Sequence, residues 1–198
     1  MKNILIIGKN SFIAKNFIND FKNRINIFYF NKIFKKDKKT LYEKYLEQNI
    51  KRNKINIILN FAANNDNSFG GNFSKILESN FYLPLSILKI SNKFQITLFC
   101  FLSKDMNENK IIKNFYALSK EMLNVYVNSK QNNCKIRLLN IDSVFGPYDL
   151  NKRRIFPSIF NHLFDNRKKN FNINQFKNFT FVKDLNNEIF RLFSNQKK

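Results

Sequence analysis

The chain has 198 residues, with 35 lysines and arginines against 14 aspartates and glutamates, and a formal net charge of +21. This length suits one domain with a sizeable core and is short for two. No apolar run is long enough to span a membrane, and Gly8 interrupts the apolar N-terminal run before it resembles a secretory signal. We therefore expect a single, cytoplasmic domain.

The positive charge brings nucleic-acid binding into consideration. The basic residues are scattered through every segment, however, and accompany an excess of Asn, Ile and Phe, which is more typical of compositional drift than of a phosphate-binding groove. Nucleic acid is therefore a disfavoured partner, although the charge suits an anionic substrate. Cys100 and Cys134 lie in or beside apolar runs and predict buried thiols without a disulfide, and His162 has no companions that would form a metal site.

Apolar runs and helix-length stretches alternate along the chain. Continuous hydrophobicity is typical of strands buried on both faces, and the runs are Ile4–Ile7, Ile25–Phe30, Ile55–Leu59, Ile96–Leu102 and Ile136–Ile141. The intervening stretches predict helices over Phe12–Arg24, Thr40–Asn53, Asn72–Asn92 and Lys110–Lys130. This alternation predicts an α/β fold, a Rossmann-like doubly wound parallel sheet.

Residues 151–198 differ from the rest of the chain in composition and in the pattern of predicted elements. A basic patch precedes a short helix around 155–164, and an Asn/Lys loop leads to Phe179–Asp184 and a final helix. We expect a core over residues 1–150 and a small, truncated C-terminal appendage over 151–198, on the carboxyl edge of the sheet. Ligands in such folds bind at that edge.

The turn after the first run has a spacing typical of dinucleotide binding. Gly8 permits a tight turn, and small residues follow at Ser11 and Ala14, where further glycines are usual. Pyrophosphate would meet the start of the next helix. The predicted cofactor-binding residues of this turn are Gly8, Ser11, Phe12, Ile13 and Ala14.

The second strand ends without the acid that usually binds the ribose hydroxyls of NAD. Lys32, with Lys9 nearby, would suit a 2′-phosphate, which favours NADP over NAD. An equally supported alternative is that Lys32 and Lys9 are ordinary solvated lysines of a lysine-rich chain and bind no phosphate. Little room remains between the second and third strands for an additional strand. We therefore expect the adenine side of the cofactor pocket to be abbreviated.

Three residues form a candidate catalytic set. Ser103 ends the fourth strand, and Tyr116 and Lys120 are four residues apart, on one face of the following helix. A phenol is a poor base at its ordinary pKa near 10, and an adjacent ammonium stabilises the phenolate. The arrangement resembles the Ser and Tyr-x-x-x-Lys set of the short-chain dehydrogenase/reductase superfamily. The resemblance implies that Tyr116 is the acid/base, that Lys120 lowers its pKa and holds the ribose, and that Ser103 hydrogen-bonds the substrate oxygen.

These motifs together resemble the extended branch of the short-chain dehydrogenase/reductase superfamily, the NAD-dependent epimerase/dehydratase family. Further similar segments are Asn60-Phe-Ala62-Ala63, Asn80, the run Asn140-Ile-Asp-Ser143-Val-Phe-Gly-Pro-Tyr-Asp149, and Phe176-Lys177-Asn-Phe-Thr-Phe-Val-Lys-Asp184. The resemblance implies that Ala62, Ala63, Asn80, Tyr116 and Lys120 face the cofactor and that Ser143 and Lys177 face the substrate. Asn140 and Ser143 replace the family's arginine and asparagine, and Lys177 stands where the family has arginine.

The resemblance implies an NAD(P)-dependent epimerase, dehydratase or 4-keto reductase that acts on a nucleoside-diphosphate sugar by Tyr-Lys assisted hydride transfer. The missing glycines and short C-terminal region leave a second hypothesis, a dinucleotide-binding relative without turnover. The third hypothesis, a basic nucleic-acid-binding α/β protein, rests on charge alone. Assembly as a homodimer is left open.

Overall fold

The structure, a computed structural model, describes residues 2–65, 72–103, 114–141, 143–152, 154–165 and 178–194. Its main sheet has the order β2-β1-β3-β4-β5, and every neighbouring pair is parallel. The strands are β1 (Asn3–Ile7), β2 (Asn26–Phe30), β3 (Ile57–Asn60), β4 (Thr97–Ser103) and β5 (Ile136–Ile141). The strand order reverses between β1 and β3, which opens a crevice at the carboxyl edge of the sheet. The predicted α/β, doubly wound fold is confirmed.

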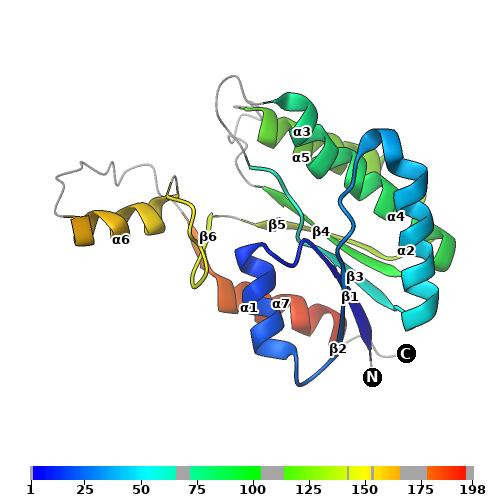
Figure 1. Ribbon diagram of the computed structural model, residues 1–198, viewed down its shortest axis with the longest axis horizontal. Coiled ribbons are helices and arrows are strands. Elements are labelled where there is room, and N and C mark those ends of the chain that lie inside the picture. Colours follow the sequence, from blue (N-terminus) through cyan, green and yellow to red (C-terminus); the bar gives the residue numbers. More distant parts are fainter. Residues whose placement is uncertain are drawn as a thin grey trace.

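Helices cover both faces of this sheet (Figure 1). On one face α1 (Phe12–Phe21) and α7 (Val182–Ser194) share an apolar cluster with β1 and β3. On the other face α2 (Lys39–Asn53), α4 (Leu83–Phe94) and α5 (Phe115–Asn128) form a second cluster with the same strands. Because both faces are covered, the strands carry continuous apolar runs. The final helix of the 151–198 segment thus packs onto the core, against α1.

The predicted helix over Asn72–Asn92 is divided into three parts. They are α3 (Phe73–Leu77), a π-helical turn η2 (Glu78–Tyr82) and α4, which has Pro84 in its first turn. Such π-turns occur frequently at functional sites. Between β2 and β3 the chain forms only a 3₁₀ turn, η1 (Lys36–Lys38), and α2, so β2 is an edge strand. This agrees with the lack of room for an additional strand.

A small second sheet lies beside the main one. Its strands β6 (Ser143–Phe145) and β7 (Phe179–Phe181) are parallel, and the sequence did not predict β6. The ring of Phe145 stacks on Phe156 of α6 (Ile155–Asp165) with 4.2 Å between centroids. Figure 1 shows α6 projecting from the body of the molecule. No helix in the described ranges is long and apolar enough to cross a membrane.

Candidate cofactor and active site

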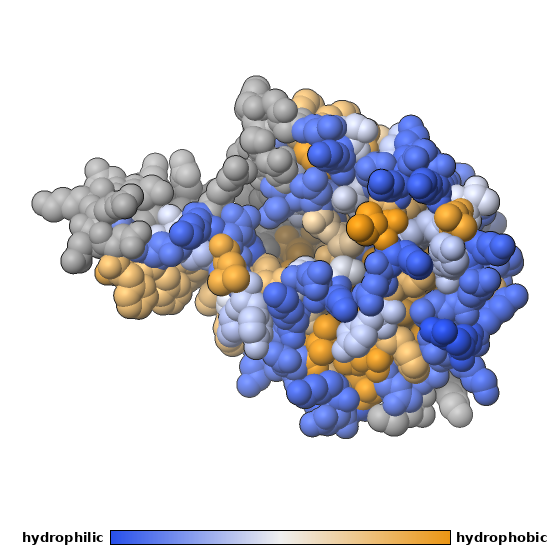
Figure 2. Space-filling model, viewed as in Figure 1, coloured by the Kyte–Doolittle hydropathy of each residue, from blue (hydrophilic) through white to orange (hydrophobic). Residues whose placement is uncertain are grey.

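A cavity of about 480 Å³ opens at the carboxyl edge of the main sheet, within the range of about 300–1,000 Å³ that small-molecule sites occupy. Figure 2 shows the hollow near the middle of the surface, with apolar atoms on its floor. Five separate segments supply its predicted site residues. These are Ser11, Phe12, Ile13, Ala62, Ala63, Ser103, Tyr116, Lys120 and Ser143.

The turn before α1 has a geometry that explains its single glycine. Gly8 has a φ of +82°, and a Cβ there would lie 2.4 Å from the backbone nitrogen of Ala62. The Oγ of Ser11 accepts a hydrogen bond from the backbone N–H of Ala14 at 3.2 Å and so caps the helix. The first-turn N–H groups of Phe12 and Ile13 lack acceptors within the helix and can meet an anion at the cavity. Ala14 itself is completely buried behind the turn.

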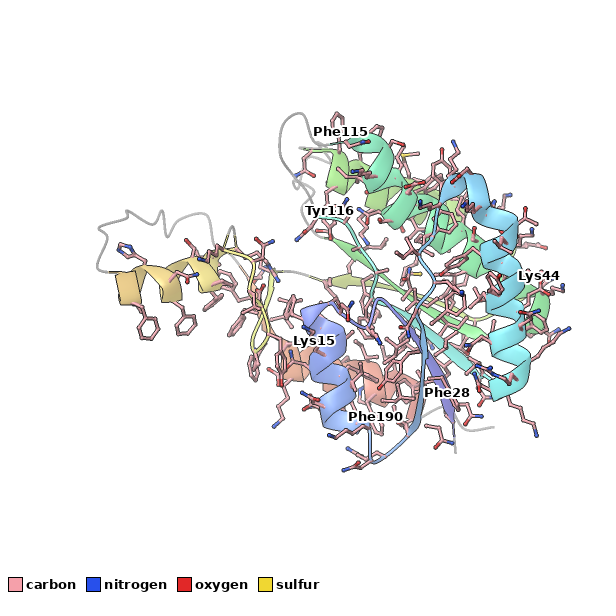
Figure 3. The ribbon with its side chains drawn as sticks, viewed as in Figure 1. Lys15, Phe28, Lys44, Phe115, Tyr116 and Phe190 are labelled. Atoms are coloured by element: carbon pink, nitrogen blue, oxygen red, sulfur yellow. The ribbon has the colours of Figure 1, made fainter. Side chains whose placement is uncertain are left out.

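The start of α5 brings Tyr116 and Lys120 to the same cavity. Asn114 caps this helix through a 2.8 Å hydrogen bond from the N–H of Ala117 to its Oδ1. In Figure 3 Tyr116 points toward the open middle of the molecule and its neighbour Phe115 points away. The Nζ of Lys120 lies 5.7 Å from the centroid of the Tyr116 ring. Ser103 closes β4 beside them, so the predicted catalytic set converges.

Lys120 is held in a buried position. Its Nζ donates a 2.8 Å hydrogen bond to the carbonyl oxygen of Phe101. Burial lowers the pKa of Lys120 to about 8, against a smaller opposing effect of the Cys100 thiol. The neighbouring Cys100 thiol is also buried, and its own burial raises its pKa to about 11. Lys120 is therefore a buried amine whose charge state changes near pH 8.

Asn80 lies behind the cavity and orders its wall. Its Oδ1 accepts a 2.8 Å hydrogen bond from the N–H of Asn64, and its Nδ2 donates to the Asn64 carbonyl oxygen at 2.8 Å. The same Nδ2 donates to the Oγ of Ser119 at 3.0 Å. Asn80 is completely buried and comes from the π-helical turn. Asn80 joins α5 to the segment after β3 that carries Ala62 and Ala63, and it does not itself line the cavity.

The sequence interpretation did not single out Arg154 or Asp149 as site residues. The Arg154 guanidinium lies 4.7 Å from the Phe12 ring centroid, and its Nη1 is 2.9 Å from Oδ2 of the buried Asp149. Its Nη2 also donates to the carbonyl oxygen of Val144. Burial raises the pKa of Asp149, which the Arg154 charge partly offsets. Both line the cavity. The signal for Arg154 in the sequence was the basic patch after residue 150, and that for Asp149 was the end of the segment Asn140–Asp149.

Four described residues of the predicted site do not line this cavity: Gly8, Ala14, Asn80 and Lys32. Lys32 lines a separate hollow beside β2 and α2, and its Nζ lies 4.7 Å from the Tyr45 ring centroid. Lys177 lies outside the described residues. In the described ranges no group of three or more His, Cys, Asp or Glu side chains could hold a metal ion.

The fold and the cavity define a Rossmann-like α/β protein with a cavity of small-molecule size at the carboxyl edge of its sheet. No protein-family model matches the sequence, and no curated protein matches it either. Among solved structures the fold has many counterparts. A Helicobacter pylori ADP-L-glycero-D-manno-heptose-6-epimerase is 17% identical, with a TM-score of 0.80 over 100% of this chain and 74% of that one.

Two further structures are similar at the same level. A UDP-glucose 4-epimerase from Thermotoga maritima, solved with UDP-glucose, is 14% identical with a TM-score of 0.78 over 99% of this chain and 74% of its own. A dTDP-4-dehydrorhamnose reductase from Bacillus anthracis, in complex with NADP, is 17% identical with a TM-score of 0.75 over 98% and 72%. At such identities the similarity establishes the shared fold.

Proposed function

We propose that the protein is an NAD(P)-dependent epimerase, dehydratase or 4-keto reductase that acts on a nucleoside-diphosphate sugar. One observation carries the proposal: Ser103, Tyr116 and Lys120 line the same cavity as the first turn of α1. Activity on nucleotide sugars is also what the names of the similar solved structures describe.

The residues around the cavity fit a nicotinamide dinucleotide. The first turn of α1 offers N–H groups and the positive end of a helix dipole to a pyrophosphate. Ala62 and Ala63 leave room beside it, and the Lys120 amine can hold a ribose hydroxyl. When bound, such a cofactor accepts or supplies a hydride. NADP is the proposed form, because lysines and no acid follow β1 and β2.

In the proposed reaction Tyr116 exchanges a proton with a hydroxyl or carbonyl oxygen of the sugar. The Lys120 cation stabilises the phenolate form, since a positive charge favours an adjacent negative one. The Ser103 hydroxyl hydrogen-bonds the same sugar oxygen and orients it. Because burial lowers the pKa of Lys120 to about 8, its stabilisation of the phenolate is available below that pH and declines above it.

The substrate side of the cavity suits an anionic ligand. Ser143 lines it and can hydrogen-bond a sugar or phosphate, while Arg154 is a planar cation that can meet phosphate oxygens. Lys177 remains a proposed contact to the diphosphate.

The test is a Tyr116→Phe variant assayed with UDP-, dTDP-, GDP-, CDP- and ADP-sugars. The change keeps the ring and removes the hydroxyl, so NADH or NADPH affinity and the unfolding temperature should stay unchanged. Turnover should fall by about 10²–10⁴-fold, because positioned acid/base catalysis is lost. Near-full activity of Tyr116→Phe would refute the assignment of the acid/base. Failure of the wild type to bind either nucleotide at saturating concentration would refute the cofactor site.

A second candidate is a dinucleotide-binding protein without turnover. The α1 turn favours it, because the two residues that match the dinucleotide-binding pattern also have structural roles there. Gly8 is required by the close backbone of Ala62, and the hydroxyl of Ser11 caps the helix. Micromolar NAD(P)H binding together with no turnover of any sugar nucleotide would favour this candidate over the first.

A further inference from the structure

A second hollow, of about 400 Å³, lies along the open edge of the main sheet. It is separate from the candidate active site, and β2 and the helix α2 form its two sides. Residues 29–32 line one side. The other side is a single face of α2, with the i, i+3, i+4, i+7 spacing of Tyr45, Gln48, Asn49 and Arg52. We call this the edge hollow.

The edge hollow combines aromatic surface with positive charge. Tyr29 is 40% exposed and Tyr45 is 37% exposed. Each ring has an ammonium beside it: Lys9 Nζ is 5.5 Å from the Tyr29 centroid, and Lys32 Nζ is 4.7 Å from that of Tyr45. Arg52 adds a guanidinium to the lining.

The acids of α2 do not neutralise these charges. Glu43 and Glu47 form ion pairs with lysines of α4, at 2.6 Å to Lys89 and 2.9 Å to Lys93. No acid lines the edge hollow among the described residues, and Lys9, Lys32 and Arg52 form no ion pair with any described residue. The hollow therefore offers stacking surface, amide hydrogen-bonding groups and uncompensated cations in one place.

We propose that the edge hollow binds a nucleoside phosphate, with the base against the tyrosine rings and the phosphate against Lys32 and Arg52. Aromatic rings accept any base by stacking, and cations beside them hold the backbone phosphate. Asn31, Gln48 and Asn49 supply donors and acceptors for a base edge. The flexible lysine stem lets the Lys32 ammonium leave the Tyr45 ring for a phosphate, and the guanidinium of Arg52 can bind two phosphate oxygens. This binding does not depend on turnover, but it involves Lys32, the lysine after β2 on which the proposed preference for NADP rests.

The experiment measures AMP binding by calorimetry at about 150 mM salt, where screening weakens general attraction to the +21 charge. Tyr45→Leu should weaken AMP binding about fivefold or more, because base stacking is lost. Arg52→Gln should weaken AMP binding but leave adenosine binding unchanged, since only the phosphate contact is removed. Circular dichroism and the unfolding temperature verify that each variant folds.

Two variants serve as matched controls. Lys44→Gln removes one cation from the same helix at a position that does not line the hollow (Figure 3). Tyr126→Leu removes a tyrosine that has its own lysine, Lys130, at 4.6 Å on α5. Both controls should bind AMP as the wild type does. Equal affinity in Tyr45→Leu and wild type, or an equal loss in Lys44→Gln and Arg52→Gln, would overturn the proposal.

Further titrations identify the source of the nucleoside phosphate. If a ten-residue oligoadenylate binds more tightly than AMP and Tyr45→Leu removes the difference, the ligand is a single strand. If Tyr45→Leu weakens NADPH and AMP alike, the hollow receives the adenosine end of the cofactor. If Tyr45→Leu weakens AMP alone, the ligand is a free nucleotide. All three outcomes support the binding chemistry, and none depends on whether Tyr116→Phe alters turnover.

Discussion

Lys120 combines burial with a proposed role that requires positive charge. Because its pKa is lowered to about 8 from 10.5, the folded state releases this proton at a lower pH than the unfolded state does. The unfolded state thus binds more protons between those values, so the free energy of unfolding rises with pH in that window. Below pH 8 the folded protein bears the full cost of the buried charge.

The prediction is a gain of about 1 kcal/mol in the free energy of unfolding between pH 8 and pH 9, from this residue alone. Urea unfolding at both values checks it, with Lys120→Met as the comparison because that variant lacks the titrating amine. The comparison with Lys120→Met is needed because Cys100 and Cys134, whose pKa values burial raises to about 11, contribute with the opposite sign as the pH approaches and passes 9. An identical pH response in the wild type and Lys120→Met would show that Lys120 does not titrate there.

Gly8 is required by its backbone surroundings. An alanine Cβ would lie 2.4 Å from the Ala62 nitrogen and 2.7 Å from its Cα, and the φ of +82° is itself strained for any other residue. Gly8→Ala should therefore lower the free energy of unfolding by about 1–3 kcal/mol as well as impair cofactor binding. Lys9→Ala in the same turn should have little effect on stability. If thermal unfolding finds Gly8→Ala as stable as Lys9→Ala, the close contact with Ala62 is not maintained.

At the scale of single elements, the π-helical turn η2 shapes the wall of the cavity through Asn80. Asn80→Ala would remove two part-buried hydrogen bonds to the backbone of Asn64, each worth about 0.5–1.5 kcal/mol, and the hydrogen bond to Ser119. We expect lower stability together with at least a tenfold weaker affinity for NADPH.

Asn92→Ala is a suitable control for Asn80→Ala. Asn92 lies at the far end of α4, and its Oδ1 accepts a 3.1 Å hydrogen bond from the N–H of Cys134, away from the cavity. It should lose stability and keep its NADPH affinity. If both variants bind NADPH equally well, Asn80 is structural only and does not position the cofactor site.

The elements themselves were largely predictable because both faces of the sheet are covered. The apolar runs became strands within a few residues, as at β5, where Ile136–Ile141 is matched at both ends. The helix breaks could not be foreseen, since the apolar pattern over Asn72–Asn92 continues through the π-helical turn. Strand β6 was missed because it is short and pairs with β7, which lies far away in sequence. The predicted break at 150 likewise did not reveal that α7 packs on α1.

The candidate site was predictable where its residues are close together in sequence or stand at the end of a predicted strand. Tyr116 and Lys120 lie one helical turn apart, and Ser103 ends a strand, so their convergence follows from the fold. Arg154 was not predictable in this way. Its place in the cavity depends on the buried Asp149 and the Phe12 ring, contacts that only the tertiary structure brings together.

At the scale of the whole molecule, repulsion dominates the electrostatics. The net charge is +21, and the ion pairs among the described residues engage few acids: Glu43, Glu47, Asp149 and Glu188. A charge far from zero destabilises the compact state by self-repulsion, and salt screens that repulsion over about 10 Å at 0.1 M. The small number of attractive pairs means that screening removes more repulsion than attraction.

We therefore expect the unfolding temperature to rise between about 20 mM and 200 mM sodium chloride, by about 3 °C for each 1 kcal/mol of repulsion that is screened. An uncharged solute such as glycerol at the same osmolality should not reproduce the rise, because it does not screen charge. The same screening should weaken the binding of AMP and of nucleotide sugars, since the positive field that attracts these anions is reduced. A fall in unfolding temperature over this range would mean that the attractive pairs, and not the surplus cations, control the stability of the fold.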